Sequence, residues 1–384
     1  MFSFKKLLKN FFIIVLCSIL GLVLIGGATL ALIMLTTPKA PRPDNASCIC
    51  YVTGKSGGHL FPALTLAKEY ANKSPNGSTI LFFSTDTPLD KLIIKKAPQV
   101  NVYEPLSLRN VPRNTIIAWP GYCLDLLRIS IKITRTFARY RPEAVVSMGG
   151  YISVPVGLIA WLLRIPVYVY ELNVVPGSAV QFLSRFATTT FTCFNETAHL
   201  LPPKAHVERA AYPIRFAADD KLSKTAAREH LKITGFDKVL LVVGGSQGSR
   251  FINDLVPEGL ASIKAQKSVF VIHQTGEGEV KRVQELYEKK GLHALVFAFR
   301  DDMNVLYSAA NLVVARAGAG SLFESVFFAT PSLIIPLETE VTDHQLDNAL
   351  AMEKEHPLLF SVLRQGAVEK KPNLFTQKLS ELLQ

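Results

Sequence analysis

The sequence predicts an α/β protein with two nucleotide-binding domains, each built on a parallel sheet, behind one N-terminal membrane-spanning helix. Two glycine-rich turns, at residues 54–59 and 244–249, each follow an apolar strand-like run and precede a helical pattern. Such turns expose main-chain N–H groups at the start of a helix, where a phosphate can approach closely. Strand, turn and helix alternate after each turn, which is typical of a parallel sheet. The membrane prediction depends on residues 11–35, which carry no charge.

The N-terminal region is predicted to contain a basic tail, a membrane-spanning helix and a linker. Residues 1–10 are a basic tail with three lysines, and residues 11–35 form a run of 25 uncharged residues. A helix rises about 1.5 Å per residue, so this run is longer than the bilayer hydrocarbon core of about 30 Å is thick. We expect a transmembrane helix over residues 11–35 and a Pro-rich linker over residues 36–47.

The amino-acid composition indicates which partners the protein can bind and the redox state of its cysteines. Lys and Arg number 42 against 31 Asp and Glu, which gives a net charge of +11. The simplest interpretation of this excess is solubility. Attraction to an anionic lipid or a phosphorylated substrate comes next, and nucleic acid third, because no run of basic residues is interleaved with aromatic ones. The five cysteines are scattered without metal-ligand spacing, which predicts reduced thiols in a cytosolic protein.

The first domain is predicted from apolar runs and from the polar residues that follow them. The runs cover residues 48–52, 79–83, 144–148 and 167–170. Glu171 and Asn173 follow the last run, and open α/β sheets bind their ligands beyond the carboxyl ends of the strands. Both residues are therefore site candidates, although either could instead cap the helix that follows.

A longer segment between residues 106 and 140 combines basic with apolar residues. Its basic residues are Arg109, Arg113, Arg128, Lys132, Arg135 and Arg139. Two interpretations stay open. The segment is either an amphipathic helix that covers the sheet or a basic, apolar surface that rests on an anionic bilayer, and both can hold for different parts of it.

The second domain repeats the pattern after a polar, helix-like stretch at residues 219–235. Strands are predicted at residues 239–243, 269–273, 295–299, 312–315 and 332–336. The fourth of these runs leads into Arg316, with Glu324 in the helical pattern that follows, and the fifth leads into residues 341–348. The alternation predicts a second parallel sheet.

Taken in order along residues 48–350, these motifs resemble those of the MurG family. Its members transfer N-acetylglucosamine from UDP-N-acetylglucosamine to the lipid-linked muramyl-pentapeptide of peptidoglycan synthesis. The matching segments are Gly54–His59, Met148–Tyr151, Glu171–Asn173, Gly244–Ser249, Arg316–Glu324 and His344–Ala349. The resemblance implies a GT-B-like fold, with two Rossmann-like domains that face each other across a cleft. The acceptor domain would cover residues 48–216, the linker 217–237 and the UDP-sugar domain 238–384.

The resemblance implies a donor site for UDP-N-acetylglucosamine. Its residues would be Arg215, Gly245, Ser246, Gln247, Arg300, Glu324, His344, Gln345 and Asn348. Arg215 and Ser246 match the family positions that neutralise the pyrophosphate, and a carboxylate such as Glu324 can accept both ribose hydroxyls. We expect no metal and no cofactor, because no acidic cluster has metal-ligand spacing. Main-chain N–H groups, a helix dipole and a cation would then carry the leaving charge.

The resemblance also implies an acceptor site and a base. The acceptor-binding residues would be Gly54, Lys55, Ser56, Gly57, Gly58, Tyr151 and Asn173. His59 is the first candidate for the catalytic base that deprotonates the acceptor 4-hydroxyl, because imidazole titrates near the working pH. Glu171 is the second candidate. In the alternative, His59 only orients the pyrophosphate of the lipid. The transfer would invert the anomeric carbon.

The implied partners are UDP-N-acetylglucosamine, undecaprenyl-pyrophosphoryl-muramyl-pentapeptide, membrane lipids and other cell-wall synthesis proteins, with no nucleic acid. The implied role is in cell-wall biogenesis, cell shape and cell division. The expected location is the inner cell membrane, with the catalytic domains on the cytoplasmic side. The three lysines before the span favour the opposite placement, and Lys39 and Arg42 after the span partly offset this bias.

Departures from the family pattern keep two other functions open. Lys55 stands in place of a glycine, Ala317 in place of a serine, and the C-terminal tail is short. These departures are compatible with a catalytically degenerate, membrane-anchored binding protein. Four retained functional side chains argue against decay: His59, Arg215, Glu324 and Gln345. The other alternative is a related glycolipid glycosyltransferase that uses a UDP-sugar and a diacylglycerol-type acceptor.

Overall fold

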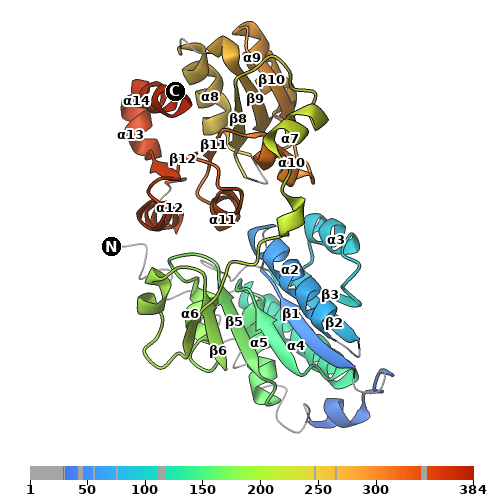
Figure 1. The fold of residues 1–384 in the computed structure, drawn as a ribbon. Helices are drawn as coiled ribbons and strands as arrows, with labels where there is room; N and C mark the ends of the chain where they lie inside the picture. Colours follow the sequence, from blue (N-terminus) through green and yellow to red (C-terminus); the bar gives the residue numbers. More distant parts are fainter. Residues whose placement is uncertain are drawn as a thin grey trace. The chain divides into compact units, whose positions relative to one another are not determined.

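The computed structural model describes two compact units of the chain. The described residues are 29, 31–41, 46–54, 57–74, 77–109, 112, 118–245, 248–263, 266–338 and 344–384. Contacts divide the chain into unit 1, Met1–Pro213, and unit 2, Ile214–Gln384. Each unit is a parallel sheet with helices on both faces (Figure 1).

The sheet of unit 1 has a reversal in its strand order. Its strands are β1 (Ser47–Val52), β2 (Ser78–Thr85), β3 (Val102–Leu106), β4 (Ala144–Ser147), β5 (Val167–Glu171), β6 (Thr189–Thr192) and β7 (Val207–Arg209). Their spatial order is β3-β2-β1-β4-β5-β6-β7, and every pairing is parallel. From β1 the chain adds β2 and β3 on one side and then crosses back to place β4 on the other side of β1. The carboxyl ends of β1 and β4 therefore flank the topological switch point, where open sheets bind ligands.

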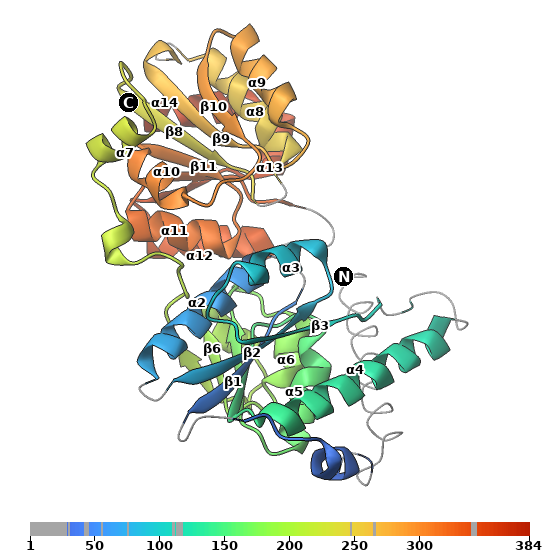
Figure 2. The same ribbon diagram turned by 90° about the vertical axis from the view of Figure 1, so that its right-hand side faces the viewer.

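The helices of unit 1 lie on the two faces of this sheet. They are α2 (Gly57–Lys73), α3 (Pro88–Lys95), α4 (Trp119–Tyr140), α5 (Ser153–Leu162), α6 (Ser178–Leu183) and the 3-10 helix η2 (Glu196–Leu200). Figure 2 shows α2 on one face and α4, α5 and α6 on the other. Apolar side chains of α4 recur every three or four residues and are buried, which is the pattern of a helix that covers a sheet. Phe137 of α4, for example, packs edge-on against Phe83 of β2 with ring centroids 6.0 Å apart.

Unit 2 repeats the architecture. Its strands are β8 (Lys238–Val243), β9 (Val269–Gln274), β10 (His293–Phe297), β11 (Leu312–Ala315), β12 (Ser332–Ile334) and β13 (Phe360–Val362). The spatial order is β10-β9-β8-β11-β12-β13, again all parallel, with the switch point between β8 and β11. Its helices are η3 (Ala218–Asp220), α7 (Lys224–His230), α8 (Arg250–Ala261), η4 (Gln266–Ser268), α9 (Val280–Lys289), α10 (Met303–Ala309), α11 (Ala319–Phe328), α12 (His344–Glu355), α13 (Gln365–Lys370) and α14 (Asn373–Leu383).

The C-terminal helix α14 closes the core of unit 2 against α8. Phe375 of α14 is fully buried, and its ring lies where a side chain of Gly259 on α8 would be. A Cβ at Gly259 would come within 2.5 Å of that ring, so the glycine lets the two helices approach. Burial of a side chain of this size stabilises the fold by about 1.5–3 kcal/mol. Helix α14 therefore completes the hydrophobic core of unit 2.

The structure confirms the two predicted Rossmann-like domains with parallel sheets. The strands β3, β6, β7 and β13 were not predicted, because they are short, or carry threonine or proline in place of an apolar run. In the part of the chain that the structure describes, no helix is both long and apolar enough to cross a membrane. Of the predicted span, residues 11–28 and 30 lie outside the described residues. The predicted cleft between the domains stays a prediction.

Candidate active site

The two predicted acceptor loops touch at the switch point of unit 1. Gly54 follows β1, and Gly150 follows β4 with a φ of +85°. A Cβ at Gly54 would lie 2.6 Å from the Cα of Gly150, and a Cβ at Gly150 would lie 2.3 Å from the Cα of Gly54. Only two glycines permit this approach of backbone to backbone. The contact brings together two segments that lie far apart in the sequence.

Beside this contact begins α2, a helix of 17 residues with no acidic residue in its first turn. Gly57 and Gly58 open the helix, so its positive end stands directly behind the first glycine-rich turn. Lys55 and Ser56, which were predicted to bind the acceptor, lie outside the described residues.

His59 is the third residue of α2 and is partly buried. Its Nδ1 atom is buried and has no hydrogen-bond partner among the described residues. Burial lowers the pKa of the imidazole from its ordinary value of 6.5. The ring is therefore neutral at physiological pH, which is the state in which a histidine can accept a proton.

Glu171, the other candidate base, uses both carboxylate oxygens to hold the loop after β5. Its Oε1 accepts hydrogen bonds from the main-chain N–H of Asn173 at 2.9 Å and from the Asn173 side chain at 3.2 Å. Its Oε2 accepts from the N–H of Gly177 at 2.9 Å. Burial raises the pKa of the Glu171 carboxyl, and these hydrogen bonds oppose the rise. Glu171 thus shapes the loop that carries Asn173.

Tyr151 follows the glycines at the end of β4 and is partly buried. Its hydroxyl donates to the carbonyl of Leu108 at 3.3 Å, which ties the acceptor-side loop to the segment after β3. Burial raises the pKa of the phenol, so Tyr151 can act here as a hydrogen-bonding group but not as an ionised one.

The second glycine-rich turn lies at the switch point of unit 2. Gly245 and Gly248 have φ values of +92° and +75°. A Cβ at Gly248 would lie 1.9 Å from the carbonyl oxygen of Thr275, so only glycine fits there. Ser249 then caps α8 by accepting from the N–H of Ile252 at 3.4 Å. Ser246 and Gln247, which were predicted to bind the donor, lie outside the described residues.

Arg316, at the end of β11, was not among the predicted site residues. Its Nε donates to Ser249 Oγ at 3.0 Å. One of its terminal nitrogens, Nη1, donates to the carbonyls of Ile335 and Pro336 and to the side chain of Gln365. No carboxylate is among its hydrogen-bond partners in the described residues. Burial lowers the pKa of the guanidinium to about 10, so it stays charged at neutral pH. An arginine directly after a fully apolar strand was the signal that could have identified it.

The predicted pyrophosphate cation and the predicted ribose carboxylate of unit 2 pair with each other. Arg215 Nε donates to Glu324 Oε1 at 2.9 Å. Burial raises the pKa of Glu324, and the interactions with Arg215 and Tyr307 oppose the rise. The Arg215 guanidinium also lies 5.0 Å from the ring centroid of Phe216. The pair places the carboxylate of Glu324, on α11, beside the Arg215 cation at the start of unit 2.

The side chain of Arg300 forms an ion pair with Asp302, two residues further along the chain. Its Nε donates to Asp302 Oδ1 at 2.7 Å, and its Nη2 pairs with Asp302 Oδ2. The guanidinium lies 5.7 Å from the ring centroid of Phe297. Because this ion pair holds the side chain locally, the contribution of Arg300 to a donor site would come from the main chain of its loop.

The three residues predicted to read the sugar lie on the first turns of α12. Gln345 Oε1 accepts from the N–H of Leu337 at 3.0 Å, and Asn348 Nδ2 donates to the carbonyl of Ala317 at 3.3 Å. Asn348 is buried, whereas His344 is exposed. The helix start is therefore fixed to the loops after β11 and β12, next to the second switch point.

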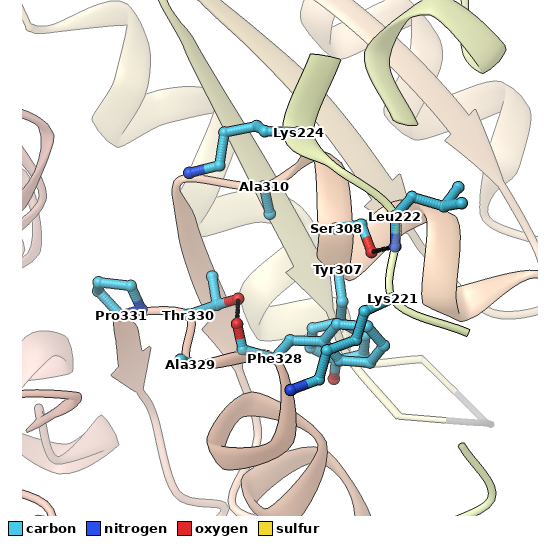
Figure 3. A pocket seen from close by; sticks show the side chains of 10 residues that line it. All are labelled: Lys221, Leu222, Lys224, Tyr307, Ser308, Ala310, Phe328, Ala329, Thr330 and Pro331. Carbon is cyan, nitrogen blue, oxygen red and sulfur yellow. Dashed lines mark hydrogen bonds between the residues drawn. The ribbon is translucent and has the colours of Figure 1, made fainter. Parts of the chain in front are cut away.

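A separate pocket of about 190 Å³ lies at the C-terminal ends of α10 and α11 (Figure 3). It is lined by Lys221, Leu222, Lys224, Tyr307, Ser308, Ala310, Phe328, Ala329, Thr330 and Pro331. None of these is a predicted site residue, but Tyr307 interacts with Glu324 of the predicted donor site. Among the described residues, no group of three or more His, Cys, Asp or Glu side chains could hold a metal ion.

Comparisons with known proteins extend over both units. Residues 49–192 match the glycosyltransferase family 28 N-terminal domain, and residues 239–363 match the glycosyltransferase family 28 C-terminal domain. The chain is also similar to two curated proteins named UDP-N-acetylglucosamine--N-acetylmuramyl-(pentapeptide) pyrophosphoryl-undecaprenol N-acetylglucosamine transferase. The protein of Myxococcus xanthus is 34% identical over 78% of this chain and 76% of its own length. That of an Acidovorax species is 30% identical over 87% of this chain and 78% of its own length.

Solved structures show the same relationship. The crystal structure of Acinetobacter baumannii MurG superposes with a TM-score of 0.66 at 25% identity, over 88% of this chain and 91% of that one. The glycosyltransferase of kitacinnamycin superposes with a TM-score of 0.60 at 17% identity, which supports the fold alone.

Proposed function

The chain belongs to the MurG family within glycosyltransferase family 28, and from this membership we propose that it transfers N-acetylglucosamine from UDP-N-acetylglucosamine to lipid-linked N-acetylmuramyl-pentapeptide. Membership confirms the resemblance that the motifs indicated. It also favours the muramyl lipid over a diacylglycerol acceptor, since both curated relatives described above carry the muramyl name.

The observation that carries the proposal is the occurrence of one glycine-only turn at the switch point of each unit. Gly54 meets Gly150 in unit 1, and Gly248 meets Thr275 in unit 2. A reaction between a lipid diphosphate and a sugar nucleotide needs two such diphosphate sites. The transfer also requires the two turns to meet across a cleft, which stays a prediction.

In the donor half, we assign the pyrophosphate to the turn before α8 and the ribose to Glu324. Charge on the departing UDP would be stabilised by main-chain N–H groups, the N-terminus of α8 and the guanidinium of Arg215. Arg316 adds a buried positive charge that contacts the same turn through Ser249. Gln345 and Asn348 would read the sugar from the start of α12. This arrangement supports a transfer that uses no metal.

In the acceptor half, His59 is the base of the proposed mechanism. Its imidazole takes the proton of the muramyl 4-hydroxyl while the oxygen attacks the anomeric carbon, and UDP leaves from the opposite face with inversion. The neutral state of the ring supports this role. Glu171 holds Asn173 and the loop after β5, so we assign it to positioning. Tyr151 and the glycines of the first turn would bind the lipid pyrophosphate.

We place the protein on the cytoplasmic side of the inner membrane, with residues 11–35 as its anchor and α4 against the lipid. Leu124, Arg128, Arg135 and Arg139 lie on one face of α4 and are exposed. The only carboxylate of the helix, Asp125, is paired with Arg109 and, at 3.9 Å, with Arg128 of this face, so the charge of the face stays net positive. Such a face suits anionic headgroups. Other cell-wall synthesis proteins are proposed as partners at the same membrane.

The test is incubation of membranes that contain the full chain with labelled UDP-N-acetylglucosamine and lipid-linked muramyl-pentapeptide. We expect label in the lipid fraction, and none with UDP-galactose and diacylglycerol. Label in diacylglycerol would support the alternative acceptor. UDP binding without any transfer would support the degenerate binding protein.

A further inference from the structure

A chain of three buried polar side chains runs through unit 2 from α9 to α8. Tyr287 of α9, His273 of β9 and Asn253 of α8 are all fully buried. The Tyr287 hydroxyl and His273 Nδ1 are 2.8 Å apart, and His273 Nε2 and Asn253 Oδ1 are 3.1 Å apart. Asn253 Nδ2 then donates to the carbonyl of Thr275 at 3.2 Å.

The direction of every hydrogen bond in this chain follows from its last member. Because the amide NH₂ of Asn253 donates to Thr275, its Oδ1 must accept, so His273 carries its proton on Nε2. His273 Nδ1 is then an acceptor, and the Tyr287 hydroxyl donates its hydrogen bond to it. Burial lowers the pKa of His273 to about 3, which keeps the ring neutral and this tautomer in place.

The last hydrogen bond of this series reaches Thr275, which packs against the second glycine-rich turn. The Thr275 carbonyl oxygen occupies the space in which a Gly248 side chain would lie, at 1.9 Å from the position of its Cβ. The N–H of Gly248 in turn donates to the carbonyl of Gly245 at 3.0 Å within the turn. A shift of Thr275 would therefore move the turn that we assign to the UDP pyrophosphate.

We propose that Tyr287, His273 and Asn253 are positioning residues that fix the Thr275 carbonyl, and with it the glycine-rich turn, in the geometry that binds a nucleoside diphosphate. Apolar residues of similar volume would fill the same space without the cost of burying polar groups. A fully satisfied polar network instead specifies one arrangement. The inference rests on the proposed function, because it requires this turn to bind the diphosphate.

The test is Tyr287→Phe, which removes one hydroxyl and leaves the ring and its packing in place. It leaves His273 Nδ1 without its donor, so the tautomer and the Asn253 contact are no longer fixed. We expect the Kd for UDP, measured by titration calorimetry on the full chain, to rise about tenfold. The KM for the donor should rise by a similar factor, while the KM for the acceptor stays within about twofold of the original. Asn253→Ala removes the hydrogen bond to the Thr275 carbonyl. It should likewise raise the KM for the donor and leave the KM for the acceptor nearly unchanged.

Val283→Ala is the matched control. Val283 lies one turn before Tyr287 on α9 and is fully buried, so this variant loosens the same helix without touching the polar chain. It should lower the melting temperature and leave the Kd for UDP unchanged. If Tyr287→Phe and Val283→Ala lower the melting temperature alike and both bind UDP like the unmodified protein, the chain has only a structural role and the inference is wrong. Failure of the unmodified protein to bind UDP would overturn the proposed function itself.

Discussion

Arg215 and Glu324 are joined by a hydrogen bond of 2.9 Å although 109 positions separate them in the sequence. Arg215 lies near the start of unit 2, and Glu324 lies on α11. The carboxylate that would accept the ribose hydroxyls is thus held beside the cation that would face the pyrophosphate. One nucleotide can engage both, so neither side chain is expected to act alone.

Glu324→Gln keeps the shape of the side chain and removes its charge. We expect the KM for UDP-N-acetylglucosamine to rise at least tenfold, because charge-assisted hydrogen bonds to the ribose and to Arg215 are lost. The KM for the acceptor should change little. Glu381→Gln on α14 is the control, since Glu381 is an exposed partner of Lys378 in the same unit. An unchanged donor KM in Glu324→Gln would rule out the ribose assignment.

His59→Ala should lower kcat by about 10²–10⁴ if the imidazole removes the acceptor proton. The Kd for UDP should stay as it was, because His59 belongs to unit 1. Glu171→Gln is the comparison, although its amide oxygen can replace only one of the two carboxylate oxygens that accept hydrogen bonds from the loop. Loss of turnover in Glu171→Gln together with activity in His59→Ala would reverse the assignment of the base.

The pH profile offers an independent test of the same base. Burial lowers the pKa of His59 below its ordinary 6.5, and only the neutral imidazole can take a proton. We therefore expect kcat/KM for the acceptor to rise with pH and to reach its plateau by neutral pH, with the midpoint of the acid limb below pH 6.5. A midpoint well above 6.5 would not fit a buried imidazole.

His273 should make the stability of unit 2 depend on pH. Its pKa is about 3 in the folded chain against an ordinary 6.5, so between these values the unfolded chain binds a proton that the native chain does not. Stability is then lost as the pH falls below about 6.5, by at most about 1.4 kcal/mol per pH unit. The His273→Gln variant has no imidazole at this position, so its free energy of unfolding lacks this dependence on pH. Its loss of stability relative to the unmodified protein should therefore be smaller at pH 5 than at pH 7.5. Denaturant titrations at the two pH values measure the difference, and an equal deficit at both would contradict the prediction.

Gly54→Ala should disrupt the contact between the two acceptor loops. The added Cβ would lie 2.6 Å from the Cα of Gly150, so one backbone must move, at a cost of about 1–3 kcal/mol. We expect a lower melting temperature and a raised KM for the lipid acceptor. Gly177→Ala is the control in the same unit, because nothing lies within 4 Å of a Cβ there and φ is −63°.

Local pattern along the chain was sufficient to predict two parallel sheets, both glycine-rich turns and the family. Each of these depends on neighbours within a few residues: an apolar run, a glycine that ends it and the helical spacing that follows. The same local reasoning missed β3, whose Glu104 and Pro105 interrupt the apolar pattern.

Partnerships between distant side chains depended on the tertiary structure. Glu324 was a candidate ribose ligand in the sequence, whereas in the folded chain it also pairs with Arg215, 109 positions away. The contacts of Arg316, and the hydrogen bonds of His273 to Tyr287 and Asn253, could be recognised only from the sheet order, which places β8, β9 and β11 side by side. The reason is physical: a strand or a turn follows from contacts between near neighbours in the sequence, but the partner of a buried charge is chosen by which strands pair.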